Sequence, residues 1–179
     1  MRLILEDFLR TILLAVLLQS FAFAASEISA VGSRVFYDRD GRSSEHWRLA
    51  LLGGYQFNSQ SDQLSLTLIS DNKIDEAQFG YAFVMPSLRD YAPFDGYPYI
   101  KASVGFGNAY SKTNALTELS YGGAIGFYVT GQSGFRTRFE ISYFNREWQV
   151  DRKGKEPSIE PQRWSDSEIA FNLSLGFVF

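Results

Sequence analysis

Cysteine is absent from the 179-residue chain, and histidine occurs once, at His46. The missing cysteines exclude disulfide frameworks, thiolate metal sites and cysteine nucleophiles, and a single histidine excludes multi-histidine metal sites. The net charge of −3 argues against a nucleic-acid partner. We therefore predict no metal, no cofactor and no nucleic-acid ligand for this chain.

Long hydrophobic runs are also missing. The longest apolar stretch, Thr11–Phe23, is shorter than the ~20 residues that a transmembrane helix needs. Arg2 and Arg10 precede it, and Ala22-Phe23-Ala24 forms an A-x-A cleavage pattern. We predict that residues 1–24 are a secretory signal peptide and that residues 25–179 form one domain.

The chain is rich in aromatic residues, which make up 16% of it, and it contains 15 glycines. Apolar residues alternate with small or polar ones along most of the mature chain, which is the period of a β-strand. The alternation predicts an all-β fold of eight strands, with turn residues between them. The predicted strands are Ile28–Tyr37, Trp47–Phe57, Gln63–Ser70, Ala77–Met85, Tyr97–Tyr110, Glu118–Thr130, Phe135–Trp148 and Glu168–Phe179.

The two faces of these strands differ in size and charge. One face carries the large apolar residues, while the other carries the charges together with glycine, alanine and serine. A soluble sandwich would turn its large face inward, whereas a transmembrane barrel turns it toward lipid. Small residues suit the crowded inside of an eight-stranded barrel, so we predict an antiparallel, up-and-down transmembrane β-barrel.

The predicted lumen is polar. Arg34 is placed inward with Ala30 and Gly32, because an arginine at the lipid midplane costs about 2–4 kcal/mol. The predicted lumen network consists of Arg34, Arg48, Lys101, Glu118, Arg136, Arg138, Glu140 and Glu168. Ion pairing, rather than catalysis by paired carboxylates, is the simpler interpretation of these charges.

Aromatic residues gather at the predicted strand ends, as they do at the two membrane–water interfaces of a barrel. The predicted girdles are Trp47, Trp148 and Trp164 at one end and Phe57, Tyr128, Phe135 and Phe179 at the other. Trp148 and Trp164 share the parity of the lumen face, which a bulge or strands longer than the bilayer would explain.

Four segments carry the alternating pattern most clearly: Tyr97–Gly107, Tyr121–Phe127, Arg138–Tyr143 and Leu173–Phe179. Together they resemble the second half of the OmpA/OmpX-type outer-membrane barrels. The resemblance implies an outer-membrane location, periplasmic termini, and outer loops at Asp38–His46, Asp71–Glu76, Ser111–Thr117 and Asp151–Arg163. The terminal pattern Phe171, Leu173, Leu175, Phe177 and Phe179 is similar to the sorting signal that such proteins present to the barrel-assembly machinery.

Function is less specified than architecture. We predict a non-enzymatic barrel with a structural or surface-interaction role, in contact with outer-membrane lipid and lipopolysaccharide. The charged loop Asp151–Arg163 is the candidate contact for lipopolysaccharide phosphates or a host-surface ligand. A narrow solute pore is one alternative. The other, a lipid A deacylase of the PagL type, needs a histidine near a strand-end serine, and the stretch around Ser142 has none.

Overall fold

The computed structural model describes residues 26–39, 42–57, 62–70, 74–89, 95–110, 115–151 and 163–179. The eight strands are β1 (Ser26–Arg39), β2 (Arg42–Phe57), β3 (Asp62–Ser70), β4 (Ile74–Val84), β5 (Gly96–Tyr110), β6 (Ala115–Thr130), β7 (Phe135–Asp151) and β8 (Arg163–Val178). The predicted signal peptide, residues 1–24, lies outside the described residues. In the part that is described, no helix is long and apolar enough to cross a membrane.

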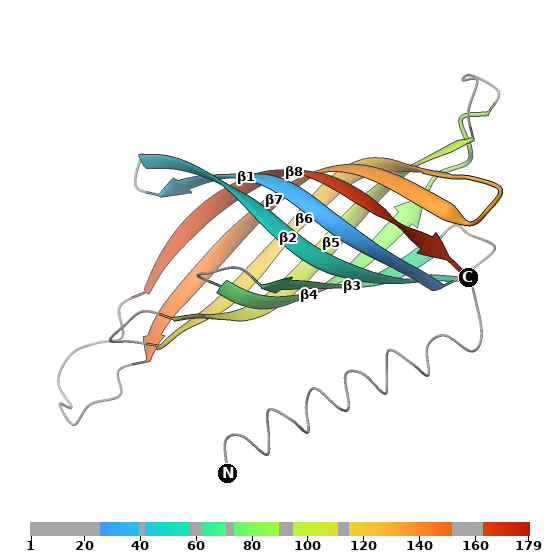
Figure 1. Cartoon of the computed structure of the whole chain (residues 1–179). Coiled ribbons are helices and arrows are strands. Elements are labelled where there is room, and N and C mark those ends of the chain that lie inside the picture. Colours follow the sequence, from blue (N-terminus) through green and yellow to red (C-terminus); the bar gives the residue numbers. More distant parts are fainter. Residues whose placement is uncertain are drawn as a thin grey trace, which may run out of the picture.

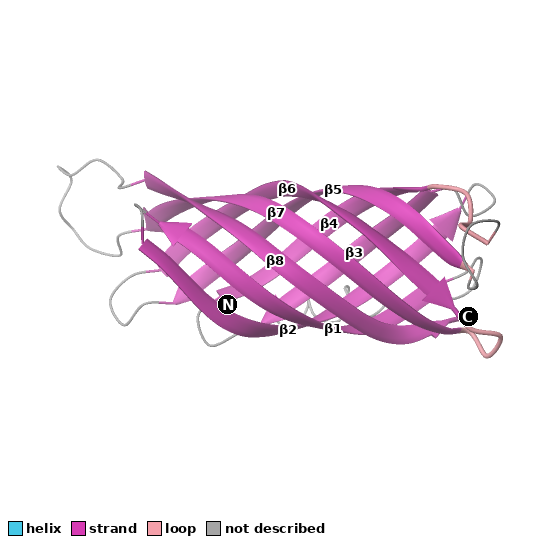
Figure 2. Cartoon of the chain, turned by 90° about the horizontal axis from the view of Figure 1, so that it is seen from above, coloured by secondary structure: helices cyan, strands magenta, loops and turns pink. Residues whose placement is uncertain are grey.

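The strands form one closed barrel in which each pairs antiparallel with its neighbours in sequence, and β1 closes the ring against β8 (Figures 1 and 2). Both Ser26 and Phe179 lie at the same end, which we call the terminal end. The opposite end, where β1–β2, β3–β4, β5–β6 and β7–β8 are connected, is the loop end. This confirms the predicted fold class.

Most strands are longer at the loop end than the alternation predicted. The predicted outer loops Asp38–His46, Asp71–Glu76, Ser111–Thr117 and Asp151–Arg163 are partly strand, because pairing continues into residues 38–39, 42–46, 74–76, 115–117, 151 and 163. Polar residues in these stretches obscured the period of two. The rest of each loop falls outside the described residues.

The turns at the terminal end follow local chemistry. In the β6–β7 turn, Gly131 N–H donates to the Phe135 carbonyl at 2.8 Å, and Gly134 adopts φ +78°, a left-handed conformation that favours glycine. At the same end, β4 is followed in the chain by its neighbour in the sheet, β5. Met85 and Leu88 N–H groups extend the pairing by donating to the carbonyls of Pro98 and Gly96, at 2.8 Å each.

The outer surface is apolar over the middle of the barrel. The exposed large residues include Leu49, Leu51, Phe79, Phe83, Ile100, Phe106, Ile125, Phe139, Ile141, Phe171, Leu173 and Leu175. A contiguous apolar surface of this kind is unstable in water and suits acyl chains. The barrel therefore has the inside-out polarity of a membrane-spanning structure.

Toward the loop end, hydrogen-bonded pairs of polar side chains lie on the outer surface. Tyr121 donates to Glu147 at 3.3 Å and Tyr143 to Asn145 at 3.1 Å, both on the exposed face. β7 has 17 residues. At about 3.3 Å per residue and a tilt of about 40°, such a strand spans roughly 40 Å, more than the ~25 Å apolar band of an outer-membrane barrel. The loop end consequently extends beyond the apolar band.

Candidate functional site

A group of buried charges fills the lumen near the loop end, and we call it the loop-end cluster: Arg48, Arg146, Glu76, Glu118 and Glu168. Arg146 lies at its centre, fully buried, with Nη1 2.7 Å from Glu76 Oε2 and Nε 2.8 Å from Glu168 Oε2. Its Nη1 also pairs with Glu118. One guanidinium from β7 thus joins carboxylates from β4, β6 and β8.

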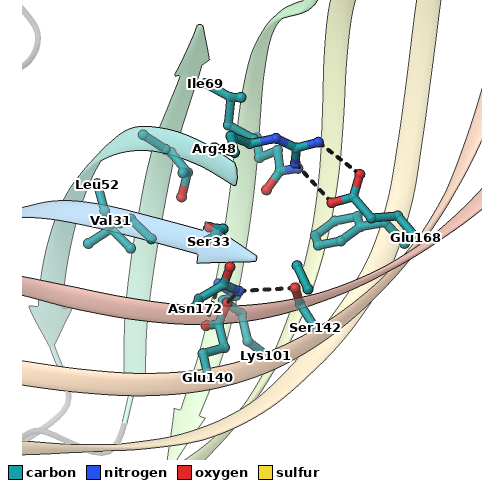
Figure 3. Close-up of a pocket in the computed structure, with 15 residues that line it drawn as sticks. Val31, Ser33, Arg48, Leu52, Ile69, Lys101, Glu140, Ser142, Glu168 and Asn172 are labelled. Carbon is teal, nitrogen blue, oxygen red and sulfur yellow. Dashed lines mark hydrogen bonds and ion pairs between the residues drawn. The ribbon is translucent and has the colours of Figure 1, made fainter. Parts of the chain in front are cut away.

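Arg48 completes the loop-end cluster from β2. Its Nη1 and Nη2 bind the two oxygens of Glu168 at 2.8 and 3.0 Å, a bidentate pair (Figure 3). Nη2 also donates to the Tyr37 hydroxyl at 2.5 Å, and the Tyr37 ring stacks on His46 with centroids 4.9 Å apart. The single histidine is therefore packed at the edge of this cluster rather than in a loop.

A second group, the terminal-end cluster, consists of Glu27, Arg136, Arg138, Gln56 and Gln63. Glu27 Oε2 accepts from Arg136 Nη1 at 2.8 Å and from Arg138 Nη2 at 2.5 Å. Gln63 Nε2 donates to the same oxygen at 3.0 Å, and the Arg136 guanidinium lies 4.0 Å from the centroid of the Tyr128 ring. Here one carboxylate holds two guanidinium groups.

Between the clusters lies the central pair, Lys101 and Glu140, with Nζ 2.6 Å from Oε2. Tyr99 and Asn172 donate to the same carboxylate at 2.9 and 3.1 Å. A cavity of about 40 Å³ separates this pair from the Arg48–Glu168 pair, with Val31 and Leu52 on its apolar side (Figure 3). A second cavity, of about 10 Å³, lies toward the terminal-end cluster.

The lumen has room for these groups because small residues face them. A Cβ on Gly105 would collide with the side chains of Glu76 and Ser120, and a Cβ on Gly54 would lie 2.6 Å from Gln63 Nε2. Glycine at these inward positions therefore makes space for buried polar side chains instead of providing a flexible backbone. Among the buried side chains of the described lumen, five cations face five carboxylates: Arg48, Lys101, Arg136, Arg138 and Arg146 against Glu27, Glu76, Glu118, Glu140 and Glu168. Asp166, which is partly buried on the inward face of β8, adds a further carboxylate at the loop end.

Seven of the eight residues predicted for the lumen network lie inside the barrel, as their burial and contacts place them: Arg48, Lys101, Glu118, Arg136, Arg138, Glu140 and Glu168. Arg34 does not, and its inward assignment is wrong. Its side chain is half exposed on the outside and pairs with Glu45 at 2.7 Å. Near the loop end, Arg34 stands clear of the lipid midplane, so the energetic argument for turning it inward fails.

The outward position of Arg34 also fixes which residues of β1 face the lumen. Ala30 and Arg34 are exposed, whereas Val31, Ser33 and Val35 are buried. Both faces of this strand carry small residues, and neither carries a continuous row of large apolar ones, so parity alone could not orient it.

Three further residues complete the lumen that the sequence interpretation missed: Glu27, Glu76 and Arg146. All three are at most 4% exposed. Glu27 and Glu76 each lie one residue before the start of a predicted strand. Arg146 lies inside the predicted strand Phe135–Trp148, on the same inward face as Arg138. Extending the inward parity to the strand ends would have found all three.

The predicted aromatic girdles are partly wrong. Trp47 and Phe179 are 73% and 71% exposed on the outside, and Phe135 and Phe57 are outward too, each in contact with an aromatic neighbour. Tyr128 and Trp148 instead face inward, where Tyr128 accepts from Gln56 at 2.9 Å and Trp148 Nε1 donates to Asp166 at 2.9 Å. Polar partners inside the barrel satisfy their hydroxyl and indole groups. The side chain of Trp164 lies outside the described residues.

The proposed assembly residues share one face of the last strand. Phe171, Leu173, Leu175, Phe177 and Phe179 are all exposed on the apolar outside. Ser142, the serine weighed as a nucleophile, is 3% exposed and accepts from Asn172 Nδ2 at 3.1 Å. Its described neighbours are those of a buried structural hydroxyl.

No protein-family model matches the sequence, and a comparison with curated proteins finds no match. Solved structures share the fold, among them the following three. Neisserial surface protein A has a TM-score of 0.59 at 9% identity, covering 86% of this chain and 97% of its own. The N-terminal β-barrel domain of Pseudomonas aeruginosa OprF has a TM-score of 0.53 at 17% identity, over 87% and 97% of the two chains.

The outer membrane protein OprG from Pseudomonas aeruginosa has a TM-score of 0.51 at 12% identity, over 87% of this chain and 96% of its own. At these identities the likeness establishes fold, and it confirms the architecture that the OmpA/OmpX-type resemblance implied. Combined with the apolar exterior and the ion-paired interior, it makes this chain a membrane-spanning, eight-stranded β-barrel with the fold of the small outer-membrane proteins.

Proposed function

We propose that this chain is a non-enzymatic integral barrel of the outer membrane, with a structural role or one in surface contacts made at its loop end. The observation that supports this most strongly is the filled lumen. Five cations and five carboxylates of the described interior pair with one another, and the two cavities hold only a few water-sized particles. Side chains therefore fill most of the centre of the barrel.

The loop end is the surface proposed to face outward, with the termini in the periplasm. There Arg34 and Trp47 project on the outside near the edge of the apolar band, where lipopolysaccharide phosphates would lie. The charged segment Asp151–Arg163, most of it outside the described residues, remains the second candidate contact, for lipopolysaccharide or a host-surface ligand. The exposed row ending at Phe179 is proposed as the signal for the barrel-assembly machinery.

An enzymatic role has less support. Ser142 is buried in the lumen on β7, and His46 lies against Tyr37 at the loop end on β2, with β8 and β1 between the two strands. A serine hydroxyl is a weak nucleophile without an adjacent base. Incubation with lipid A followed by mass spectrometry should leave every acyl chain in place, and loss of an acyl chain with wild-type protein would contradict the proposal.

The membrane role is tested by gel migration and conductance. The protein should fractionate with outer membranes and migrate differently before and after boiling in detergent. In planar bilayers, the paired lumen should give no discrete channels. Resolved unitary currents from purified protein would favour the narrow pore, for which the two neighbouring cavities are the structural argument.

The lipid contact is tested by the amount of lipopolysaccharide that copurifies with the barrel. Arg34→Ala should reduce it, while Glu147→Gln, an exposed change at the same end, should not. Equal retention by the two variants would contradict the assignment of Arg34 to lipopolysaccharide.

A further inference from the structure

Arg138 of β7 lies deep in the lumen and is 2% exposed. Its Nη2 donates to Glu27 at 2.5 Å and to Gln63 at 3.1 Å. Its Nε and Nη1 are buried and make no hydrogen bond to a described residue. Its other partners include the Tyr99 and Tyr128 rings, whose centroids lie 5.1 and 5.6 Å from the guanidinium carbon. A guanidinium group carries five N–H donors, and leaving buried donors unsatisfied is costly.

A second unsatisfied donor lies at the same place. The cavity of about 10 Å³ is lined by Arg138, Ser174, Asn172, Glu140, Val31 and Leu52. The Ser174 hydroxyl is buried and likewise has no partner in the part of the chain that the structure describes. Strands β7 and β8 therefore bring a cationic donor and a hydroxyl donor to one small space.

The acceptor that lines this cavity is already engaged. Glu140 Oε1 accepts from Asn172, and Oε2 accepts from Lys101 at 2.6 Å and from Tyr99 at 2.9 Å. The amide nitrogen of Asn172 is engaged too, since it donates to both Glu140 and Ser142. Arg138 and Ser174 thus line a space whose other polar groups have partners.

Charge points to the class of ligand. Around this cavity, Lys101, Arg136 and Arg138 face two carboxylates, Glu27 and Glu140, which leaves one positive charge in excess. Asp62 is the other acidic side chain buried at this end, and it lies on the outer face, bonded to Tyr81. An uncompensated charge in a low-dielectric interior is expensive, so an anion is stabilised here more than a neutral molecule.

We propose that the cavity between Arg138 and Ser174 binds one monoatomic anion of the halide class. A volume of about 10 Å³ admits a ligand the size of a water molecule. Polyatomic anions such as sulfate or gluconate are too large for it. The anion accepts hydrogen bonds from Arg138 and Ser174 and balances the excess positive charge of the terminal-end half of the lumen.

The test compares salts at equal ionic strength. The full chain is refolded into detergent in sodium chloride, sodium bromide or sodium gluconate, and its unfolding midpoint is measured as a function of anion concentration. Chloride and bromide should raise the midpoint saturably, and gluconate should not. Indistinguishable midpoints in the three salts would overturn the proposal.

Two serine variants locate the effect. Ser174→Ala should weaken the halide dependence roughly tenfold, as expected for one hydrogen bond to a charged ligand. Ser142→Ala is the matched control, because it removes a buried lumen hydroxyl beside the other cavity and should leave the dependence unchanged. Equal loss in both variants would overturn the assignment.

Crystals grown in bromide give a readout that does not depend on folding stability. An anomalous peak between Arg138 and Ser174 is expected. An ordered water only at that position, or bromide confined to surface cations, would overturn the proposal.

Discussion

The loop-end and terminal-end clusters are mirror images in charge. At the loop end, two guanidinium groups face three carboxylates, whereas at the terminal end two guanidinium groups face one. In each cluster the ion at the centre has the sign that is in the minority: Arg146 touches all three carboxylates, and Glu27 touches both arginines. The two clusters and the central pair together have no net charge, while each cluster by itself does.

The two clusters also differ in how they satisfy the remaining polar atoms. Charged groups dominate the loop end, whereas the terminal end uses Gln56, Gln63 and the Tyr128 ring around its single carboxylate. Removing the minority ion of a cluster should therefore leave like charges buried together, while removing a majority ion should relieve an excess of charge.

The largest effect is expected from Arg146→Met. It leaves Glu76 and Glu118 without their cation in a buried site, and breaking such a pair costs about 3–5 kcal/mol. We expect the folded, unboiled gel band to be lost or the denaturant midpoint to fall steeply. A midpoint like that of the wild type would contradict the central role of Arg146.

Glu27→Gln should come next. The amide can still accept a hydrogen bond but no longer balances Arg136 and Arg138, so we expect a loss of about 2–3 kcal/mol from charged hydrogen bonds. Denaturant unfolding in lipid vesicles measures it. If Arg136→Gln proved more damaging than Glu27→Gln, the minority-ion interpretation of this cluster would fail.

Glu118→Gln removes a majority ion of the loop-end cluster, in contrast to Arg146→Met, which removes the minority ion. It removes one of three carboxylates and keeps an acceptor for Arg146, which makes the loop-end cluster neutral. We expect the free energy of unfolding to change by no more than about 1 kcal/mol, well below the effect of Arg146→Met. Equal destabilisation by the two variants would show that the sign of the removed charge is irrelevant.

The smallest effect belongs to Arg34→Ala. Arg34 and Glu45 are both exposed on the outside, where water and salt screen their attraction, so no measurable change in the unfolding midpoint is expected. A large loss of stability would mean that Arg34 reaches the lumen after all.

Much of the fold could be predicted because one face of most strands is uniformly large and apolar. The row Phe171, Leu173 and Leu175 fixes the orientation of β8 without reference to any partner. Arg34 could not be placed in this way, since its strand has small residues on both faces and its depth in the membrane depends on the register with β2.

The candidate site was predictable only in part for a related reason. Seven charged residues follow from the alternation inside the predicted strands, but Glu27 and Glu76 precede the predicted strand starts, where the alternation assigns no face. The pairing of Arg146 with carboxylates from three other strands depends on barrel closure. No local pattern in the sequence encodes it.

The claim that the apolar outer surface of the barrel faces lipid is tested most directly by spin labels. They can be attached to single introduced cysteines, because the chain has no cysteine of its own. Single labels at Ile141 and Leu173, which are outward on neighbouring strands, are compared in lipid vesicles with one at Ser43 near the loop end. The two wall positions should be more accessible to oxygen than to a water-soluble nickel chelate, and Ser43 should show the reverse. Preferential access of the nickel chelate to Ile141 and Leu173 would contradict the inside-out barrel.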